Sequence, residues 1–197
     1  MCGRFFIAEE DSDEELRSLI GMLNRRKPAD APVKTCGEIF PTDTVPVVAN
    51  SRSMERTVFP MRWGYGRRDS HVLINVRSET AAEKPLFRDG MLQRRCLIPA
   101  SSYFEWERRG KARTKYAIRA AGCGMIYMAG IYRIREGQPE FLILTREPAP
   151  AIAFIHDRMP VLVPYAAREA WLLRGELPQP PSAWMAVPEG DVQLTLF

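Results

Sequence analysis

The chain has 197 residues and a formal net charge of +4, and hydrophobic residues make up 46% of it. This length fits one domain over residues 1–197, and the composition is too apolar for a disordered chain. No apolar run approaches the roughly 18 residues of a membrane-spanning helix, and the acidic segment near the N-terminus has the wrong charge for a signal peptide. We therefore expect a monomer with no membrane partner, in the cytoplasm, and associated with the nucleoid if the source is bacterial.

Basic residues gather in short clusters outside that acidic segment. Six acids fall within residues 9–15, so the rest of the chain is more basic than the total suggests. The clusters lie at 25–27, 67–68, 94–95 and 108–115. They suit a polyanion such as nucleic acid, although solvated loops between strands also carry such clusters.

The four cysteines do not have metal-site spacing. They stand at positions 2, 36, 96 and 123 without any Cys-x-x-Cys pair, and only two histidines accompany them. A structural zinc site and a disulfide framework are therefore not expected, and we predict neither metal nor cofactor. Cys96 and Cys123 lie in apolar or glycine-rich context and are expected in the core.

The predicted elements begin with a helix over residues 12–23. Ser12 and Glu15 have the spacing of a capping box, and four apolar residues after them share one helical face. Short β-type runs follow at 44–50, 56–63, 71–78, 94–107, 115–120, 125–134, 140–147 and 159–164. Short helices are expected near 79–87 and 166–176, with a last turn at 180–187. Many short strands with few helices predict an α+β domain built on a mostly antiparallel, barrel-like sheet.

Cys2 would become the first residue after removal of the initiator methionine. A terminal cysteine can condense its amine with an aldehyde and then close a thiazolidine ring with its thiol, a step favoured because it is intramolecular. The usual pKa values of these groups, about 7.7–8.0 and about 8.5, require help from a nearby acid or base. The alternative is that Cys2 is only a small second residue that permits methionine removal.

The segment Asn-Val-Arg-Ser-Glu-Thr at 75–80 is a second candidate. Strand alternation predicts that Asn75, Arg77 and Glu79 share one face. Burying three such side chains is costly unless they serve a site or pair with one another. A solvated strand face is the alternative.

Glu105 stands between Phe104 and Trp106. A carboxyl group among aromatic rings is a candidate for a raised pKa, and hence for moving protons near neutral pH. The alternative is an acid at a strand end that pairs with Arg108 or Arg109.

His156 precedes Asp157 and Arg158 at the start of an apolar run. Such a histidine could donate to a developing oxyanion or to a leaving alkoxide, although a structural role is the common one. Arg158 could hold a phosphate with both nitrogens of its fork or pair with a nearby acid.

These residues occur in an order that resembles the SRAP (SOS response-associated peptidase) family. The similarity extends over nearly the whole chain and rests on MCGRF, FPT, RWG, INVRSET, FR, RRCLIPA, FEW, AGIY and HDRMPVL, at 1–5, 40–42, 62–64, 74–80, 87–88, 94–100, 104–106, 129–132 and 156–162. The sequence departs from the family pattern at 65–71 and at 144–154, and Ser102 stands where the family has glycine.

The resemblance implies the family's β-rich α+β fold and a reaction with abasic sites in single-stranded DNA. Removal of Met1 would expose Cys2, which would form a thiazolidine crosslink with the ring-opened sugar and so shield the lesion. By motif, Asn75 would orient the amine and the sugar, and Glu105 would move protons during methionine removal and ring formation. His156 would assist sugar ring opening.

The resemblance also implies a DNA-binding surface. Arg4, Arg77 and Arg158 would contact the phosphates beside the lesion, and Trp63 would help to shape the surface. Strand-cleaving lyase activity through the imine could accompany the crosslink.

Two other functions stay open from the sequence. One is a conventional cysteine or serine peptidase that uses Cys2 or Ser101 with His156 and Glu105, and it predicts repeated turnover of peptides. The other is a single-strand binder without covalent chemistry, built from aromatic residues and basic loops.

Overall fold

The computed structural model describes residues 2–9, 14–25, 32–66 and 71–193, with the side chains of 190–193 excluded. The helices are α1 (Glu14–Asn24), α2 (Pro85–Gln93) and α3 (Arg168–Arg174), with 3-10 turns η2 (Ala81–Glu83), η3 (Pro150–Ile152) and η4 (Tyr165–Ala167). The strands are β1 (Arg4–Ile7), β2 (Gly37–Ile39), β3 (Thr44–Asn50), β4 (Arg56–Trp63), β5 (Tyr65–Gly66), β6 (Val72–Leu73), β7 (Asn75–Arg77), β8 (Arg95–Ala100), β9 (Ser102–Arg109), β10 (Ala112–Ala120), β11 (Ile126–Arg135), β12 (Gln138–Arg146), β13 (Met159–Pro160) and β14 (Trp184–Gln193). In the part of the chain that the structure describes, no helix has the length and apolar character to cross a membrane.

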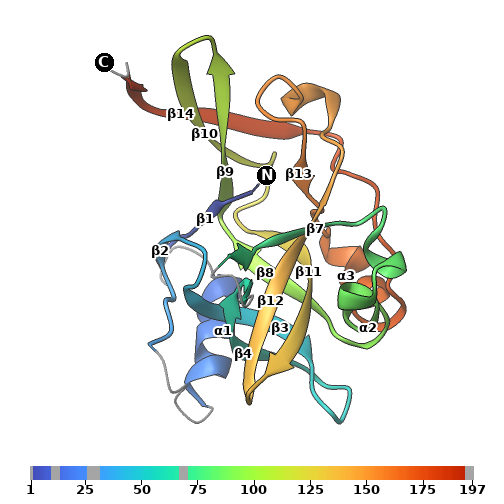
Figure 1. Cartoon of the computed structure of the whole chain (residues 1–197). Helices are drawn as coiled ribbons and strands as arrows, with labels where there is room; N and C mark the ends of the chain where they lie inside the picture. Colours follow the sequence, from blue (N-terminus) through green and yellow to red (C-terminus); the bar gives the residue numbers. More distant parts are fainter. Residues whose placement is uncertain (1, 10–13, 26–31, 67–70, 194–197) are drawn as a thin grey trace.

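Five strands form a closed barrel. Their order is β11-β8-β3-β4-β12, and the pairing of β12 with β11 closes the ring. All neighbours run antiparallel except β4 and β12, which are parallel. The expected α+β fold with a mostly antiparallel, barrel-like sheet is confirmed (Figure 1).

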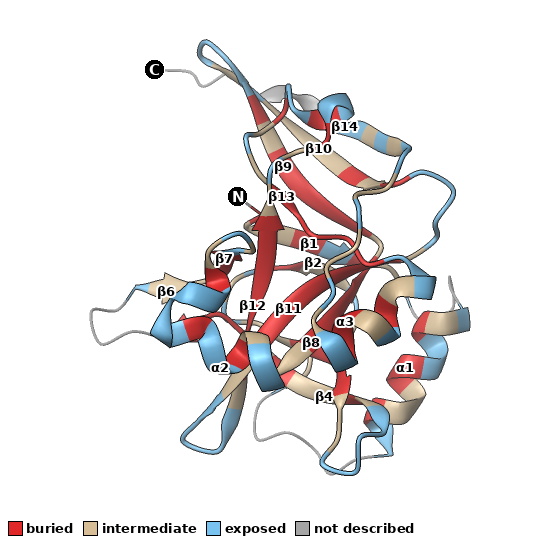
Figure 2. Ribbon diagram, turned by 90° about the vertical axis from the view of Figure 1, so that its right-hand side faces the viewer, coloured by how far each residue is buried: buried red, intermediate tan, exposed pale blue. Residues whose placement is uncertain are grey.

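The barrel strands are apolar on both faces, which is why they read as nearly continuous hydrophobic runs. Along β12, Phe141 and Ile143 belong to one core cluster, whereas Leu142 and Leu144 belong to a second. The second cluster also contains Trp171 of α3 together with side chains of α1 and α2, so it lies outside the barrel under the helices. The first cluster fills the interior and continues to Phe5 of β1 and to Leu16 and Ile20 of α1. Figure 2 shows the barrel strands as mostly buried.

A second sheet rises from the barrel in the order β14-β10-β9-β1-β2 (Figure 1). Strand β1 lies near its middle and pairs antiparallel with both β9 and β2. Phe5 of β1 packs on Trp63 with ring centroids 5.1 Å apart. The N-terminal segment is thus held between the second sheet and the end of the barrel core.

Two expectations from the sequence need correction, and others fall on residues that the structure does not describe. The last turn expected at 180–187 is wrong from Trp184 onward, because this segment extends as β14 and pairs with β10. Cys123 is exposed in the turn after β10 rather than in the core, whereas Cys96 is buried as expected. The capping residue Ser12 and the basic pairs at 26–27 and 67–68 lie outside the described residues.

Candidate active site beside a basic cleft

Cys2 is fully buried just ahead of β1. Its carbonyl oxygen accepts a hydrogen bond of 2.8 Å from the side-chain amide of Asn75. Its thiol donates to the carbonyl oxygen of Arg4 over 3.5 Å, a distance typical of weak sulfur bonds. The Cys2 backbone and side chain are therefore fixed by the fold, while Met1 lies outside the described residues.

Asn75 comes from β7, which pairs in parallel with β12 at the end of the barrel. Its side chain is buried, and its Oδ1 atom has no hydrogen-bond partner among the described residues. Buried amide oxygens are nearly always paired, so this one is a free acceptor next to Cys2. It suits an incoming donor such as an amine or a sugar hydroxyl.

Burial raises the pKa of the Cys2 thiol far above its usual range, and the nearby Glu105 carboxylate raises it further. The thiol is therefore protonated in this environment. Since the thiolate is the stronger nucleophile, Cys2 needs a neighbouring base before it can react.

Glu105 lies on β9 and is almost fully buried. Burial raises the pKa of its carboxyl group above the usual range, and the nearby His156 opposes this rise. A carboxyl group whose pKa moves toward neutrality can both give and accept a proton at physiological pH. Glu105 is thus suited to proton transfer, as the aromatic neighbours in the sequence suggested.

His156 faces Glu105 across the site, with 4.0 Å between Nε2 and Oε2. Its Nδ1 lies 3.0 Å from the backbone nitrogen of Arg158 and 2.7 Å from the carboxylate of the exposed Asp157. These contacts fix the orientation of the ring, and His156 therefore presents its Nε2 atom to Glu105.

Tyr103 is a site residue that the sequence reasoning missed. It lies two positions before Glu105 on the same face of β9, and its hydroxyl is buried without a hydrogen-bond partner among the described residues. Burial raises its pKa well above the usual range, with further contributions from Cys2 and Glu105, so it is a neutral hydroxyl close to both. The period-2 spacing from Glu105 was the signal that could have identified it.

An open cleft of about 700 Å³ lies beside these residues and is hereafter called the basic cleft. It is lined by Arg4, Glu105, Trp106, Arg108, Arg113, Phe154, Ile155 and His156. The Arg4 guanidinium lies 4.7 Å from the Phe40 ring centroid and 5.1 Å from that of Trp106. Cationic and aromatic groups thus surround the entrance to a buried acid and histidine.

The sequence reasoning did not connect Arg108, Arg113 and the aromatic Trp106 and Phe154 with the site. Arg108 and Arg113 face each other on paired strands β9 and β10, near the tip of the hairpin. Like charges directly opposite one another destabilise a sheet, so an anion bound there would relieve the repulsion. The basic cluster at 108–115 lies between two β-type runs, and this pattern could have identified a basic hairpin in the sequence.

The predicted phosphate contacts have three different environments. Arg4 lines the basic cleft, and Arg77 is exposed at the end of β7 while Asn75 and Val76 are buried. Strand alternation predicted one shared face for Asn75, Arg77 and Glu79. In the structure β7 ends at Arg77, and Arg77 and Glu79 are exposed, in agreement with the alternative of a solvated face, whereas Asn75 is buried.

Arg158 is only 10% exposed and donates to the Glu79 carboxylate and to the Thr145 carbonyl oxygen, over 2.7 and 2.8 Å. The hydrogen bond from Arg158 to the Glu79 carboxylate lowers the pKa of Glu79. Arg158 therefore braces the segment that carries Glu79 and is not presented to a phosphate.

Trp63 lies in the core and not on the surface. It is fully buried, its indole N–H donates to the Ile74 carbonyl oxygen over 3.1 Å, and its ring stacks on Phe141. The prediction that Trp63 shapes the DNA-binding surface by direct contact is wrong. Trp63 ends β4, and its side chain projects into the barrel core.

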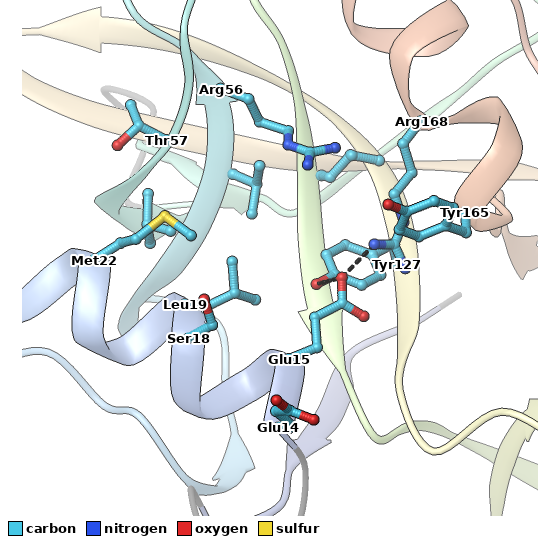
Figure 3. A pocket seen from close by; sticks show the side chains of 13 residues that line it. Glu14, Glu15, Ser18, Leu19, Met22, Arg56, Thr57, Tyr127, Tyr165 and Arg168 are labelled. Atoms are coloured by element: carbon cyan, nitrogen blue, oxygen red, sulfur yellow. Dashed lines mark hydrogen bonds and ion pairs between the residues drawn. The ribbon is translucent and has the colours of Figure 1, made fainter.

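A separate hollow of about 380 Å³ lies between α1 and the barrel (Figure 3). There the Arg168 guanidinium lies over the Tyr127 ring, 3.6 Å from its centroid, and forms an ion pair with Glu15. The Tyr127 hydroxyl donates to the same carboxylate over 2.8 Å. These contacts join α1 to the start of α3, so Glu15, Tyr127 and Arg168 have a structural role in this hollow.

In residues 2–9, 14–25, 32–66 and 71–193, no group of three or more His, Cys, Asp or Glu side chains could hold a metal ion.

The chain is similar to known proteins over most of its length. The family model described as "SOS response associated peptidase (SRAP)" matches residues 1–194. The chain is 30% identical to the abasic site processing protein YoqW of Bacillus subtilis over 87% of this chain and 80% of that protein. It is 32% identical to the abasic site processing protein YedK of Escherichia coli over 87% of this chain and 79% of that protein. The match to YoaM of Bacillus subtilis, at 32% identity, covers 68% of this chain and 64% of YoaM.

A crystal structure of a Bordetella bronchiseptica protein superposes with a TM-score of 0.74 and 22% identity, covering 96% of this chain and all of that one. At this identity the likeness concerns the fold. Since the family model spans nearly the whole sequence, the chain belongs to the SRAP family.

Proposed function

We propose that this protein processes abasic sites in single-stranded DNA by forming a thiazolidine crosslink through Cys2, after removal of Met1. The observation that carries the proposal is the convergence of Cys2, Glu105 and His156 beside a cleft whose rim is cationic. The relatives named as abasic site processing proteins support the same substrate.

In the first proposed step, Glu105 acts as general base for the water that hydrolyses the Met1–Cys2 peptide bond. The amine of Cys2 then attacks the C1′ aldehyde of the ring-opened sugar. The neutral carboxyl group of Glu105 protonates the departing hydroxyl, so that water leaves and an imine forms.

In the second step the thiol sulfur adds to the imine carbon, and the thiol proton passes to the imine nitrogen. The ring closes without any external oxidant or reductant. Asn75, held against the Cys2 carbonyl, orients the amine, while His156, whose Nε2 faces Glu105, assists the opening of the sugar ring.

The peptidase alternative has less support. The Ser101 hydroxyl accepts a hydrogen bond of 2.9 Å from the backbone N–H of Ala8. This bond connects the β8–β9 junction to the residue after β1, which is a structural role. The pKa of the Cys2 thiol is raised rather than lowered, contrary to the low thiol pKa of a catalytic cysteine that acts repeatedly.

The proposal is tested with a single-stranded oligonucleotide that carries one abasic site. Denaturing electrophoresis should reveal one covalent adduct per site. The matched control is an oligonucleotide with a tetrahydrofuran analogue, which has the same backbone but no aldehyde. Absence of the adduct, or an equal amount with the analogue, would exclude this reaction.

Replacement of Arg113 by alanine should weaken binding to intact single-stranded DNA at all sequences. Affinity falls as the salt concentration rises, and loss of one phosphate contact makes the slope of log K against log salt less steep by about 0.7 for a single strand. Binding titrations at several salt concentrations measure this slope. Arg52→Ala is the matched control, because it removes the same charge from an exposed residue outside the basic cleft, and an equal change in both variants would argue against Arg113.

A further inference from the structure

We propose that a second cleft, at the end of the barrel away from Cys2, binds an acidic peptide segment with large apolar side chains from a partner protein. This cleft, called here the basal cleft, has a volume of about 560 Å³. It is formed by the β3–β4 turn, the C-terminal half of β11 and the C-terminal ends of α2 and α3. Figure 1 shows the turns of β3–β4 and β11–β12 at the bottom and the N-terminus above the barrel.

The basal cleft concentrates exposed apolar side chains. Met54 and Leu92 are each 62% exposed, Ile134 is 58% exposed, and Leu173 is 40% exposed. They come from four different elements, yet all four line the same cleft. Single exposed apolar residues are common, whereas several that converge on one hollow are typical of an interaction surface.

Met54 is also held in an unfavourable backbone conformation. Its φ of +63° lies in the left-handed region, where glycine is the favoured residue. The turn is closed by hydrogen bonds from Ser51 N–H to Glu55 O and from Met54 N–H to Ser51 O, which any residue could form. The fold therefore gains little from a long apolar side chain at this position, while a binding surface would.

The charge of the basal cleft is positive. Its lining includes Arg52, Arg94 and Arg95 and no acidic residue. Arg95 donates to the carbonyl oxygens of Met91, Leu92, Leu172 and Leu173, so no carboxylate neutralises it.

The two other arginines differ in their pairing. Arg94 pairs with the nearby Asp89, whereas Arg52 has no ion pair among the described residues. Two positive charges thus remain beside the apolar side chains and favour a partner with carboxylates.

Nucleic acid fits this surface less well than a peptide. The most exposed apolar side chains are aliphatic or Met, and the aromatic Tyr132 in the lining is half-buried, so the cleft offers little of the aromatic stacking that holds single-stranded bases. The guanidinium group of Arg95 donates its hydrogen bonds to backbone carbonyl oxygens. Its positive charge therefore attracts an anion at a distance, but the group cannot bind a phosphate with two hydrogen bonds. A second copy of this chain would place the same arginines against each other across a two-fold axis.

The test is selection from a display library of random peptides on the wild-type protein, in the presence of excess single-stranded oligonucleotide. Peptides that also bind the Met54→Gly, Leu92→Ser, Ile134→Thr triple variant are removed. We expect the enriched peptides to combine Asp or Glu with Leu, Ile, Met or Phe. An enriched peptide, labelled with fluorescein, should bind the Met54→Gly protein about tenfold more weakly by anisotropy, and Arg52→Glu should weaken it further.

Met54→Gly also separates binding from folding. Because glycine relieves the left-handed backbone, its thermal midpoint should equal or exceed that of the wild type. Crosslinking to abasic DNA should be unchanged in all these variants, so the result is independent of the proposed function.

Three results would overturn the proposal. The first is enrichment without acidic or apolar preference, or equal binding to wild type and variants. The second is displacement of the peptide by the oligonucleotide, which would indicate a nucleic-acid surface. The third is concentration-dependent dimerisation that the same substitutions abolish, which would indicate self-association.

Discussion

Cys2→Ser is expected to abolish the heat-stable adduct with abasic single-stranded DNA while preserving the amine that forms the imine. Serine differs from cysteine by one atom, but its hydroxyl is a much weaker nucleophile toward the imine carbon than a sulfur activated by a neighbouring base. Without ring closure the imine hydrolyses back to amine and aldehyde. Denaturing electrophoresis should therefore show no band for this variant.

Borohydride provides the control for this prediction. It reduces an imine to a stable amine, so the Cys2→Ser protein should give a band when borohydride is present. The unchanged fold is checked by the thermal midpoint, since the Cys2 thiol makes only one weak hydrogen bond. A heat-stable band from Cys2→Ser without reductant would show that sulfur is not required.

Glu105→Gln is expected to slow crosslinking while making the protein more stable at neutral pH. General acid–base catalysis typically contributes about 10²–10⁴-fold, so the rate should fall within this range. Glutamine keeps the size of the side chain but cannot exchange a proton. Quench-flow or timed gel measurements give the rate, and mass spectrometry gives the extent of methionine removal.

The stability effect follows from the direction of the pKa shift. Burial raises the pKa of folded Glu105 above the unfolded value of about 4.3. The stabilising contribution of the neutral acid is present below the unfolded pKa and is lost as the pH rises through the folded pKa. The glutamine variant has no such loss, so its free energy of unfolding should exceed that of the wild type at neutral pH and approach it below pH ~4.

Urea denaturation at several pH values measures this difference. Equal stability of both proteins across the pH range would contradict the raised pKa, and wild-type crosslinking rates would remove Glu105 from its role. Glu107→Gln offers a matched control, because it is a buried carboxylate two residues away that pairs with the exposed Arg109. It should leave crosslinking unchanged.

The sequence predicted the barrel-like sheet because it contains many short β-type runs and few helices. The runs at 44–50 and 56–63 coincide with β3 and β4. The last segment was harder to assign, because its alternation is weak and its strand state depends on pairing with β10, more than sixty residues earlier. Such a long-range pairing overrides local preference.

The candidate site was partly predictable for a related reason. Cys2, Asn75, Glu105 and His156 were identified as residue types suited to the chemistry, and the structure brings them together through β1, β7 and β9. The sequence left open whether Arg158 holds a phosphate or pairs with an acid, which the structure identifies as Glu79, and it did not reveal that Trp63 points inward. Both depend on which way a side chain faces after distant segments have packed.

The closed barrel also affects how the protein behaves at high concentration. Because each of the five barrel strands has a neighbour on both sides, the strands with a single partner lie outside the ring, and a free edge is where another chain can add by hydrogen bonding. Among the described strands, those with a single partner are β2, β5, β6, β7, β13 and β14, and all but β14 have three residues or fewer. The ten-residue β14 carries Pro188, which has no N–H to donate. The architecture thus limits intermolecular sheet growth when the protein is concentrated.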